Sequence, residues 1–319
     1  MRYVIGIDGG GTKTLGILIN ENTDLLAKAE LGPSNYQILG KAKLKEQTGD
    51  FVARLIKKSN INYKVDAICV GLAGAGREKE RNEVTKLVKE LNCAKEVLAE
   101  HDASIALAGA LGGNPGIIII AGTGSIAFGR NADGKTARAG GWGYLLGDEG
   151  SGFYIGQKAL IAALKEYDGR GEKTKLTDMI MNEYVVSNIE GIIEKVYSDK
   201  LKSKGIAKIA PLVFKAAKDG DKVAEGIVEE AGRELGTLAT AVMRALNLTE
   251  NVEIALVGSI FKQKELLLGS LRNAIPAKAN VAFCDPRFPP VIGATLLALR
   301  KIGVKIDEIF LSKLEAIEI

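Results

Sequence analysis

The sequence has few of the residues that build disulfide or metal frameworks. It contains three cysteines, one histidine and seven prolines in 319 residues. Cys69, Cys93 and Cys284 are far apart and form no CxxC motif. This spacing argues against a disulfide framework, a structural zinc site and a cysteine-ligated cluster, and it predicts a reducing, cytoplasmic location.

Long apolar runs and an excess of one charge are also missing. No stretch reaches the roughly 18 apolar residues of a membrane span, and the N-terminus enters a strand pattern directly, without a signal peptide. The net charge is +4, from 43 basic and 39 acidic residues. Because the charges are nearly balanced, the sequence predicts neither nucleic-acid binding nor attachment to a membrane.

Glycine, by contrast, is abundant. There are 38 glycines, or about 12% of the chain against a usual share of roughly 7%. They cluster in short runs without a triplet period, which excludes collagen and predicts tight loops. The hydrophobic share of 46% and charged share of 26% are those of a folded protein, and the length suits two domains.

The first part of the chain alternates between short apolar runs and helical patterns. Three runs joined by turn residues predict an antiparallel meander, and strands that alternate with helices follow it. The predicted strands are 2–8, 14–20, 25–31, 65–72 and 96–99. One helix is predicted directly after residue 35, and two more are predicted at 78–91 and 103–111.

The pattern then restarts after four turn residues, 112–115, which predict a domain boundary. Strands are expected at 116–121, 126–130, 136–139, 253–257 and 280–283, with helical stretches at 150–246, 263–271 and 291–301. The sequence therefore predicts a duplicated unit, with domains 1–114 and 115–319, a helical insertion in the second, and the last helix near 291–301 packing at the hinge.

The first glycine turn, Asp8 to Thr14, has the composition of a phosphate-binding loop. Glycines leave backbone N–H groups unobstructed, so Gly10, Gly11, Thr12 and Lys13 are candidates for binding a phosphate. Asp8 offers an oxygen ligand for Mg²⁺. The turn is not a Walker A loop, because Thr12 separates glycine from lysine. The alternative is a tight hairpin with a solvated Asp8.

A second turn of this kind, Gly122-Thr123-Gly124-Ser125, follows the apolar run 116–121. Gly122, Thr123 and Gly124 are candidates for phosphate binding by the same reasoning. Two such turns, each opening one half of the chain, are expected to face each other across a cleft and hold one polyphosphate.

Asp102 follows a predicted strand and precedes a predicted helix. The functional interpretation is a general base that takes a proton from a substrate hydroxyl during phosphoryl transfer. Such residues lie at the carboxyl ends of strands. The alternative is a helix N-cap, for which aspartate is favoured. His101, the one histidine, competes for the base role but is expected to point to the other side of the chain.

The loop 140–152 is rich in glycine and is costly to order unless it has a use. It surrounds the one tryptophan, Trp142, and the acidic pair Asp148 and Glu149, which offer acceptors for sugar hydroxyls. The alternative is a helix entry with Trp142 in the core. Farther on, Gly258 and Ser259 close a strand, where glycine lets a base or ribose approach the backbone; the alternative is an ordinary turn.

Taken in order, five segments resemble the actin/hexokinase/Hsp70 ATPase superfamily: 5–19, 102–111, 117–127, 254–259 and 290–297. Within it the chain resembles the BadF/BadG/BcrA/BcrD ATPase family, and most closely its N-acetylglucosamine kinase branch. The run Gly-Gly-Trp-Gly…Gly-Asp-Glu-Gly in loop 140–152 is the most specific part of this resemblance.

The resemblance implies two RNase H-like α/β domains facing across a cleft and a kinase that uses ATP and Mg²⁺ to phosphorylate the 6-hydroxyl of N-acetylglucosamine or a close amino sugar. It implies that Asp102 is the base, that Thr12 and Thr123 hold phosphates, and that Gly258 lies near the adenosine. The residues expected around the sugar are Ser34, Asn35, Asp102, Ser125, Gly141, Trp142, Gly143, Asp148 and Glu149. A homodimer is expected.

Three alternatives remain open. The sugar could be glucosamine, N-acetylmuramic acid or a neutral hexose, because nothing local selects the N-acetyl group. The chain could also be an ATPase switch that drives a partner protein, against which the missing cysteine ligands argue. A sugar-sensing regulator is a third alternative. Against it, no appended DNA-binding domain is expected, because the ATPase pattern begins at residue 2.

Overall fold

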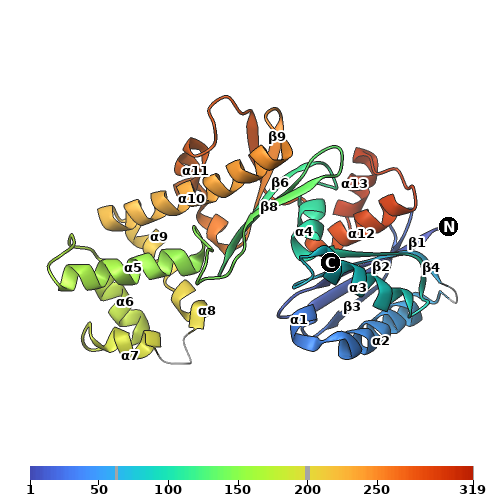
Figure 1. The fold of residues 1–319 in the computed structure, drawn as a ribbon, viewed down its shortest axis with the longest axis horizontal. Coiled ribbons are helices and arrows are strands. Elements are labelled where there is room, and N and C mark those ends of the chain that lie inside the picture. Colours follow the sequence, from blue (N-terminus) through green and yellow to red (C-terminus); the bar gives the residue numbers. More distant parts are fainter. Residues whose placement is uncertain (62–63, 198–201, 319) are drawn as a thin grey trace. The chain divides into compact units, whose positions relative to one another are not determined.

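The computed structural model describes residues 1–61, 64–197 and 202–318. Contacts within the chain divide it into two compact units. Unit 1 contains Met1–Pro115 and Pro286–Ile319, and unit 2 contains Gly116–Asp285. Figure 1 shows both units and labels most of their helices and strands.

The sheet of unit 1 has five strands: β1 (Tyr3–Gly9), β2 (Thr14–Asn20), β3 (Leu25–Leu31), β4 (Val65–Leu72) and β5 (Ala94–His101). Their order is β3-β2-β1-β4-β5. The first three strands pair antiparallel, which confirms the predicted meander, and β1, β4 and β5 run parallel. The carboxyl ends of these three parallel strands therefore meet at one edge.

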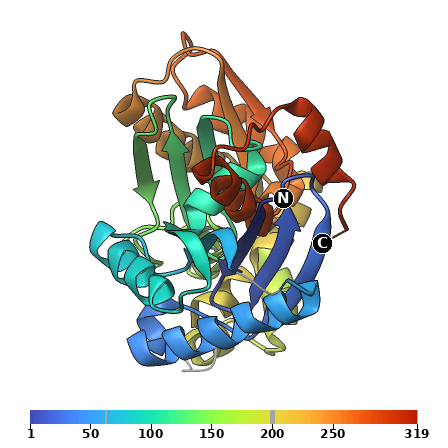
Figure 2. The ribbon, with the colours of Figure 1, turned by 90° about the vertical axis from the view of Figure 1, so that its right-hand side faces the viewer.

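Helices cover both faces of this sheet (Figure 2). One face carries α1 (Tyr36–Leu39), α2 (Lys41–Ser59) and α3 (Glu78–Lys89), and the other carries α4 (Asp102–Ala110), α12 (Pro290–Lys301) and α13 (Glu308–Glu315). Successive strand residues point to opposite faces of the sheet. Leu18 therefore packs in the core on the side of α2 and α3, and its neighbours Ile17 and Ile19 pack in the core on the side of α4, α12 and α13.

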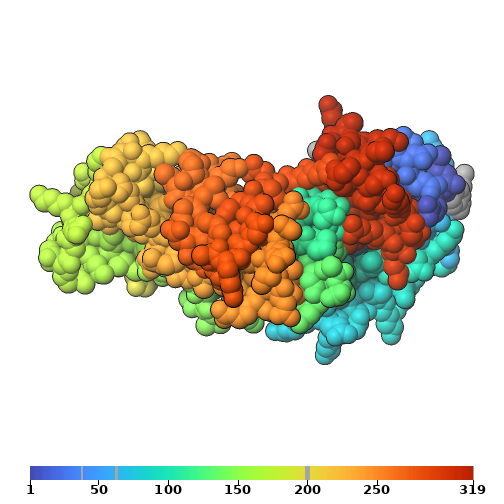
Figure 3. All heavy atoms as spheres, turned by 90° about the horizontal axis from the view of Figure 1, so that it is seen from above, coloured from blue at the N-terminus to red at the C-terminus, as the bar shows by residue number. Residues whose placement is uncertain are grey.

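Residues 286–319 lie in unit 1, although the sequence pattern predicted that they belong to the second domain. Close backbone approach explains why: a Cβ on Gly293 in α12 would lie 1.8 Å from the carbonyl oxygen of Ile105 in α4. Arg2 also donates a hydrogen bond of 2.9 Å to the carbonyl of Ile302. In Figure 3 the red atoms of this segment lie against the blue atoms of the N-terminal strands. Helix α13 was not predicted.

Unit 2 repeats the same sheet. Its strands are β6 (Gly116–Ala121), β7 (Ser125–Arg130), β8 (Thr136–Gly140), β9 (Val252–Val257) and β10 (Val281–Cys284). The strand order is β10-β9-β6-β7-β8. Read in the opposite direction, β8-β7-β6-β9-β10 matches the order β3-β2-β1-β4-β5 of unit 1, strand for strand. The predicted duplication and α/β fold class are therefore confirmed.

A helical insertion separates β8 from β9, as predicted. It contains α5 (Gly152–Tyr167), α6 (Leu176–Tyr184), α7 (Gly191–Tyr197), α8 (Lys202–Ala207), α9 (Ala210–Lys218) and α10 (Lys222–Leu246), while residues 198–201 lie outside the described part. Helix α10 packs on β6, β7 and β8. The short 3₁₀ helix η1 (Ser259–Gln263) and α11 (Lys264–Asn273) follow β9.

Within the described ranges, no helix is both long and apolar enough to span a bilayer.

Candidate active site

In unit 1, the parallel strands bring three sequence-predicted elements to one edge. Asp8 lies near the end of β1 opposite Gly71 of β4, and Leu72 of β4 pairs with His101 of β5. Asp102 is the next residue and begins α4. The turn after Asp8 is closed by a hydrogen bond of 3.0 Å from the Gly10 N–H to the Lys13 carbonyl. The sheet therefore places both carboxylates beside the glycine turn.

The electrostatics of Asp8 show that the two carboxylates interact. Its pKa is raised from 3.8 to about 6, first by burial and then by the negative charge of Asp102, with Lys13 opposing. Burial and a like charge both disfavour the ionised form. A cation bound here would relieve this repulsion. The Lys13 ammonium itself is exposed and pairs with Glu30 at 3.7 Å.

Asp102 has a neighbour that the sequence interpretation placed wrongly. The Nε2 atom of His101 lies 3.0 Å from Oδ1 of Asp102, so the histidine does not point away from it. The N-cap of α4 is also His101, whose Nδ1 accepts the Ala103 N–H at 3.3 Å. Asp102 is instead the first helical residue, and its Oδ1 accepts the same N–H at 2.8 Å. Its side chain is 44% exposed, which leaves it accessible to a substrate.

Ser34 holds the first glycine turn through hydrogen bonds. It is buried, its Oγ lies 2.6 Å from Oγ1 of Thr14, and its N–H donates to the Gly10 carbonyl at 3.1 Å. Its hydroxyl is therefore engaged within the fold. Asn35 follows it directly and precedes α1, whose first residue, Tyr36, donates its N–H to the Ala73 carbonyl at 3.2 Å. This bond holds the segment at the same sheet edge.

In unit 2, the second glycine turn is fixed to the start of α5. The Gly122 N–H donates to the Gly124 carbonyl at 2.9 Å and closes the turn. The carbonyl of Gly122 accepts from Gly152 at 2.7 Å, and that of Thr123 accepts from Phe153 at 3.2 Å. Two carbonyls of the turn therefore fix it to α5, and a Cβ added to Gly122 would meet open space.

Asp148 lies buried against this turn. It has a left-handed backbone conformation with φ of 62°, and its Oδ1 accepts the Ser125 N–H at 3.3 Å. Burial raises the pKa of Asp148, and backbone N–H groups of Ser125 and Gly143 oppose that shift. The Ser125 hydroxyl donates to the Glu149 carbonyl at 2.6 Å. The loop 140–152 is therefore anchored to the turn through Ser125.

Trp142 is on the surface, so the alternative that placed it in the core is wrong. Its side chain is 62% exposed, and the guanidinium carbon of Arg138 lies 4.4 Å from its ring centroid. A Cβ on Gly147 would lie 3.3 Å from Cβ of Trp142 and 3.5 Å from Oε2 of Glu149. Gly141, Gly143 and Gly147 thus let the loop fold back on itself, with Trp142 at its surface.

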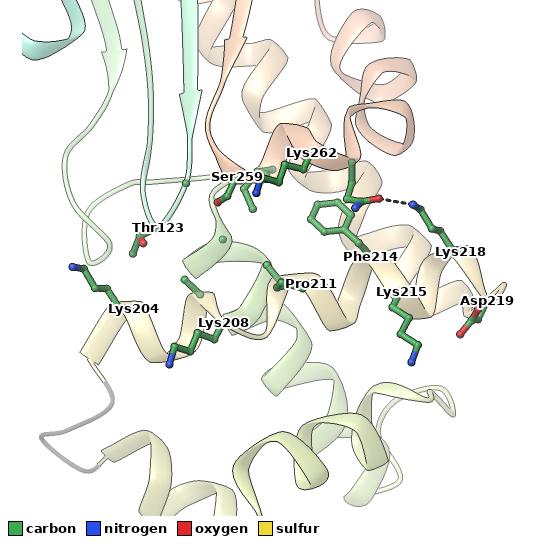
Figure 4. A pocket seen from close by; sticks show the side chains of 16 residues that line it. Thr123, Lys204, Lys208, Pro211, Phe214, Lys215, Lys218, Asp219, Ser259 and Lys262 are labelled. Atoms are coloured by element: carbon green, nitrogen blue, oxygen red, sulfur yellow. Dashed lines mark hydrogen bonds between the residues drawn. The ribbon is translucent and has the colours of Figure 1, made fainter. Parts of the chain in front are cut away.

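A cavity of about 570 Å³ opens next to the second turn. Its lining includes Thr123 of the turn and Ser259 of η1, with apolar walls from Pro211 and Phe214 of α9 (Figure 4). The lysines around it are Lys204, Lys208, Lys215, Lys218 and Lys262. Sequence reasoning missed these lysines and the apolar wall, for which the only signal was the helical spacing of the lysines within 204–218.

Gly258 comes before the cavity, at the end of β9. Its φ is 111°, and a Cβ there would lie 2.2 Å from the carbonyl oxygen of Ala121. Only glycine fits such a conformation and approach. The backbone of β9 thereby comes close to β6 just before the second turn, so that Ser259 and Thr123 line one cavity.

The sequence profile of the BadF/BadG/BcrA/BcrD ATPase family matches residues 5–298. An N-acetylmuramic acid/N-acetylglucosamine kinase of Clostridium acetobutylicum is 37% identical, over 93% of this chain and 98% of that protein. An N-acetyl-D-glucosamine kinase of Dictyostelium discoideum is 35% identical, over 92% and 97%. The crystal structure of a candidate N-acetylglucosamine kinase from Chromobacterium violaceum, 29% identical, covers 93% of this chain and 98% of its own, with a TM-score of 0.65.

Proposed function

Because the chain belongs to the BadF/BadG/BcrA/BcrD ATPase family, we propose that it is an ATP-dependent kinase of N-acetylglucosamine or a close amino sugar, acting on the 6-hydroxyl. Two relatives at 35–37% identity over most of the chain bear such names. The observation that carries the proposal is the pairing of Asp8 and Asp102 beside a glycine turn at the edge of the sheet.

The nucleotide is proposed to use the cavity of unit 2. Pro211 and Phe214 offer an apolar wall to a base, and Thr123 and the lysines offer donors to phosphates. Gly258 and Ser259 are proposed to lie along the adenosine. Gly10 to Lys13 in unit 1 and Gly122 to Gly124 in unit 2 are each proposed to contact phosphate groups of ATP, as the family resemblance implies.

The residues of unit 1 fit a magnesium ion that is shared with a nucleotide. No cluster of three or more His, Cys, Asp or Glu side chains that could hold a metal is found in the described residues. Mg²⁺ usually binds through one or two carboxylates plus substrate phosphates and keeps several waters. Asp8, whose ionised form is disfavoured by its surroundings, is the proposed ligand. When bound, the ion neutralises charge on the phosphates.

Asp102 is the proposed general base. Its carboxylate accepts the proton of the sugar 6-hydroxyl while that oxygen forms a bond to the γ-phosphorus. The bond from the γ-phosphorus to the bridging oxygen breaks at the same time, and ADP leaves with the electron pair. Catalysis then rests mainly on positioning and neutralisation of charge. The contact from His101 holds the carboxylate in place for this step.

The sugar is proposed to contact the loop 140–152 and its anchor. Asp148 is buried and offers a carboxylate to sugar hydroxyls, while Gly141 and Gly143 leave their backbone groups accessible. Glu149 and Trp142 lie on the same loop. Asn35 and Asp102 of unit 1 complete the proposed set, and Ser34 and Ser125 act mainly by holding the two turns.

A panel of sugars tests the proposal. Purified protein is incubated with Mg·ATP and, separately, N-acetylglucosamine, N-acetylmuramic acid, glucosamine and glucose, with ADP release and product mass both measured. A phosphorylated amino sugar is expected. ATP hydrolysis that is indifferent to every sugar, with no phosphorylated product, would favour the ATPase switch instead.

We also propose a homodimer. The helical insertion exposes large apolar side chains on α5 and α7, namely Ile161, Tyr167, Ile193 and Tyr197, which suit a contact between copies. Light scattering after size-exclusion chromatography measures the mass; a monomer at all concentrations would contradict the proposal. The cytoplasmic location stays a prediction.

A further inference from the structure

Arg138 places a positive charge beside the loop that is proposed to hold the sugar. It lies on β8, paired in register with Phe128 of β7, a few residues before the loop begins. Its guanidinium stacks over the exposed ring of Trp142 at 4.4 Å. A cation over an indole face is attracted by the ring, and this contact limits where the long side chain can go. Arg138 is thus oriented by Trp142.

The guanidinium is also available for a ligand. Across the described ranges, no carboxylate lies within ion-pair distance of Arg138, and the residue is exposed. The guanidinium carbon lies over the Trp142 ring, and the N–H donors of a guanidinium lie at the edge of its plane. Such an edge matches a carboxylate with two parallel hydrogen bonds, a geometry that lysine does not offer.

A neutral amino sugar has no use for this charge. Its hydroxyls need short acceptors and donors, which Asp148, Glu149 and the glycine backbone supply. The loop itself carries two acidic side chains, which would repel an anionic substrate unless a cation stood nearby. Because Trp142 packs against Gly147, near Glu149, the guanidinium of Arg138 over the Trp142 ring places a positive charge next to this loop.

We propose that Arg138 binds the carboxylate of an acidic amino sugar and thereby sets how well the enzyme accepts it relative to a neutral one. N-acetylmuramic acid is such a sugar: it is N-acetylglucosamine with a lactyl ether that ends in a carboxylate. This inference rests on the proposed function, since it assigns a specificity residue to the same sugar site.

The test varies the charge on the protein and on the sugar separately. kcat and KM are measured for wild type and Arg138→Gln with N-acetylglucosamine, N-acetylmuramic acid and the methyl ester of N-acetylmuramic acid. The ester keeps the size of the substituent and removes its charge. We expect Arg138→Gln to lose about tenfold or more in kcat/KM for the acid, mainly through KM, because a hydrogen-bonded charge pair is lost.

The same variant is expected to stay within about threefold of wild type for N-acetylglucosamine and for the ester. Arg138→Lys keeps the charge without the planar fork and is expected to fall between the two. Arg244→Gln removes an exposed arginine from the last turn of α10 and serves as the matched control, with no change for any sugar. Added salt should weaken the preference for the acid in wild type only.

The outcomes separate this inference from the proposed function. Wild type that phosphorylates N-acetylglucosamine but not N-acetylmuramic acid overturns the role of Arg138 and leaves the kinase proposal intact. An Arg138→Gln variant that loses the same factor on all three sugars also overturns it, because the effect is then structural. Wild type that phosphorylates no sugar overturns both.

Discussion

His101 Nε2 lies 3.0 Å from Oδ1 of Asp102. This contact bears on which nitrogen of His101 donates a hydrogen bond and on which oxygen of Asp102 is left to accept one. Because Nδ1 of His101 accepts the Ala103 N–H, the proton of a neutral imidazole is on Nε2 and donates to Asp102. Oδ1 accepts the Ala103 N–H as well. The free acceptor capacity of Asp102 is therefore concentrated on Oδ2, which is the oxygen we expect to face a substrate hydroxyl.

Replacement of the proposed base tests this arrangement most directly. Asp102→Asn keeps the shape and removes the proton acceptor, so we expect kcat to fall by about 10²–10⁴, with ATP and sugar binding close to wild type. Asp102→Ala should behave alike. Calorimetric titration measures binding and a coupled assay measures turnover. A kcat within about threefold of wild type would refute the base assignment.

His101 is predicted to position Asp102 without taking part in the chemistry. His101→Leu removes the donor at Nε2, so Asp102 is held less firmly and we expect kcat to fall by about 3–30-fold, with the KM for ATP nearly unchanged. His101→Gln supplies an amide donor and should recover part of this loss. If the leucine variant is as inactive as Asp102→Asn, His101 acts on the substrate itself, and if it equals wild type, the contact has no role.

The pKa of Asp8 gives a pH dependence with a definite sign. The folded-state pKa of about 6 exceeds the unfolded value of 3.8, so the folded protein binds more protons in that interval and its stability falls as the pH rises from about 4 to 7. Asp8→Asn removes the buried charge. Without Mg²⁺ we therefore expect Asp8→Asn to be more stable than wild type above pH 6, by about 1–3 kcal/mol, and the difference to shrink towards pH 4.

Thermal unfolding from pH 4 to 8 measures this difference in Tm. Asp50→Asn, on the exposed side of α2, is the matched control and should show no such trend. Added Mg²⁺ is expected to narrow the gap by stabilising wild type alone. A gap that is constant with pH would contradict the raised pKa of Asp8.

Local patterns in the sequence were sufficient to predict most of the fold. The apolar runs 2–8 and 96–99 predicted the strand ends where Asp8 and Asp102 lie. The assignment of residues 286–319 could not be made in this way. A helical pattern gives the apolar side of α12 but does not say which sheet that side covers, and the close approach of Gly293 to α4 is set by tertiary packing.

The residues that line the cavity also could not be predicted from local sequence patterns. Lys204, Phe214 and Lys262 come from α8, α9 and η1, and no local motif links them. Helix α8 is positioned partly by its contact with α5, where a Cβ on Gly156 would lie 2.1 Å from the carbonyl oxygen of Ile206. The contact between His101 and Asp102 depends on a side-chain conformation, which strand and helix patterns do not specify.

Gly122 and Gly124, the two glycines of the second turn, are predicted to have separable roles. A Cβ on Gly124 would lie 2.7 Å from Oδ2 of Asp148, so Gly124→Ala must displace that carboxylate. We expect the KM for sugar to rise by about tenfold and by more than the KM for ATP. Steady-state kinetics with each substrate varied in turn measure both.

Gly122→Ala should do the reverse. Apart from Gly122 itself and its two chain neighbours, no atom of the described residues lies within 4 Å of the added Cβ, so the fold tolerates it. A methyl group there occupies the space in which a phosphate is proposed to meet the turn. The KM for ATP is expected to rise by about tenfold with the KM for sugar unchanged. Gly226→Ala in α10 also meets open space and, in a helix interior, should be stabilising by about 0.5–1 kcal/mol without any kinetic effect. Equal changes in both constants for the two turn variants would mean that the turn does not divide the nucleotide from the sugar.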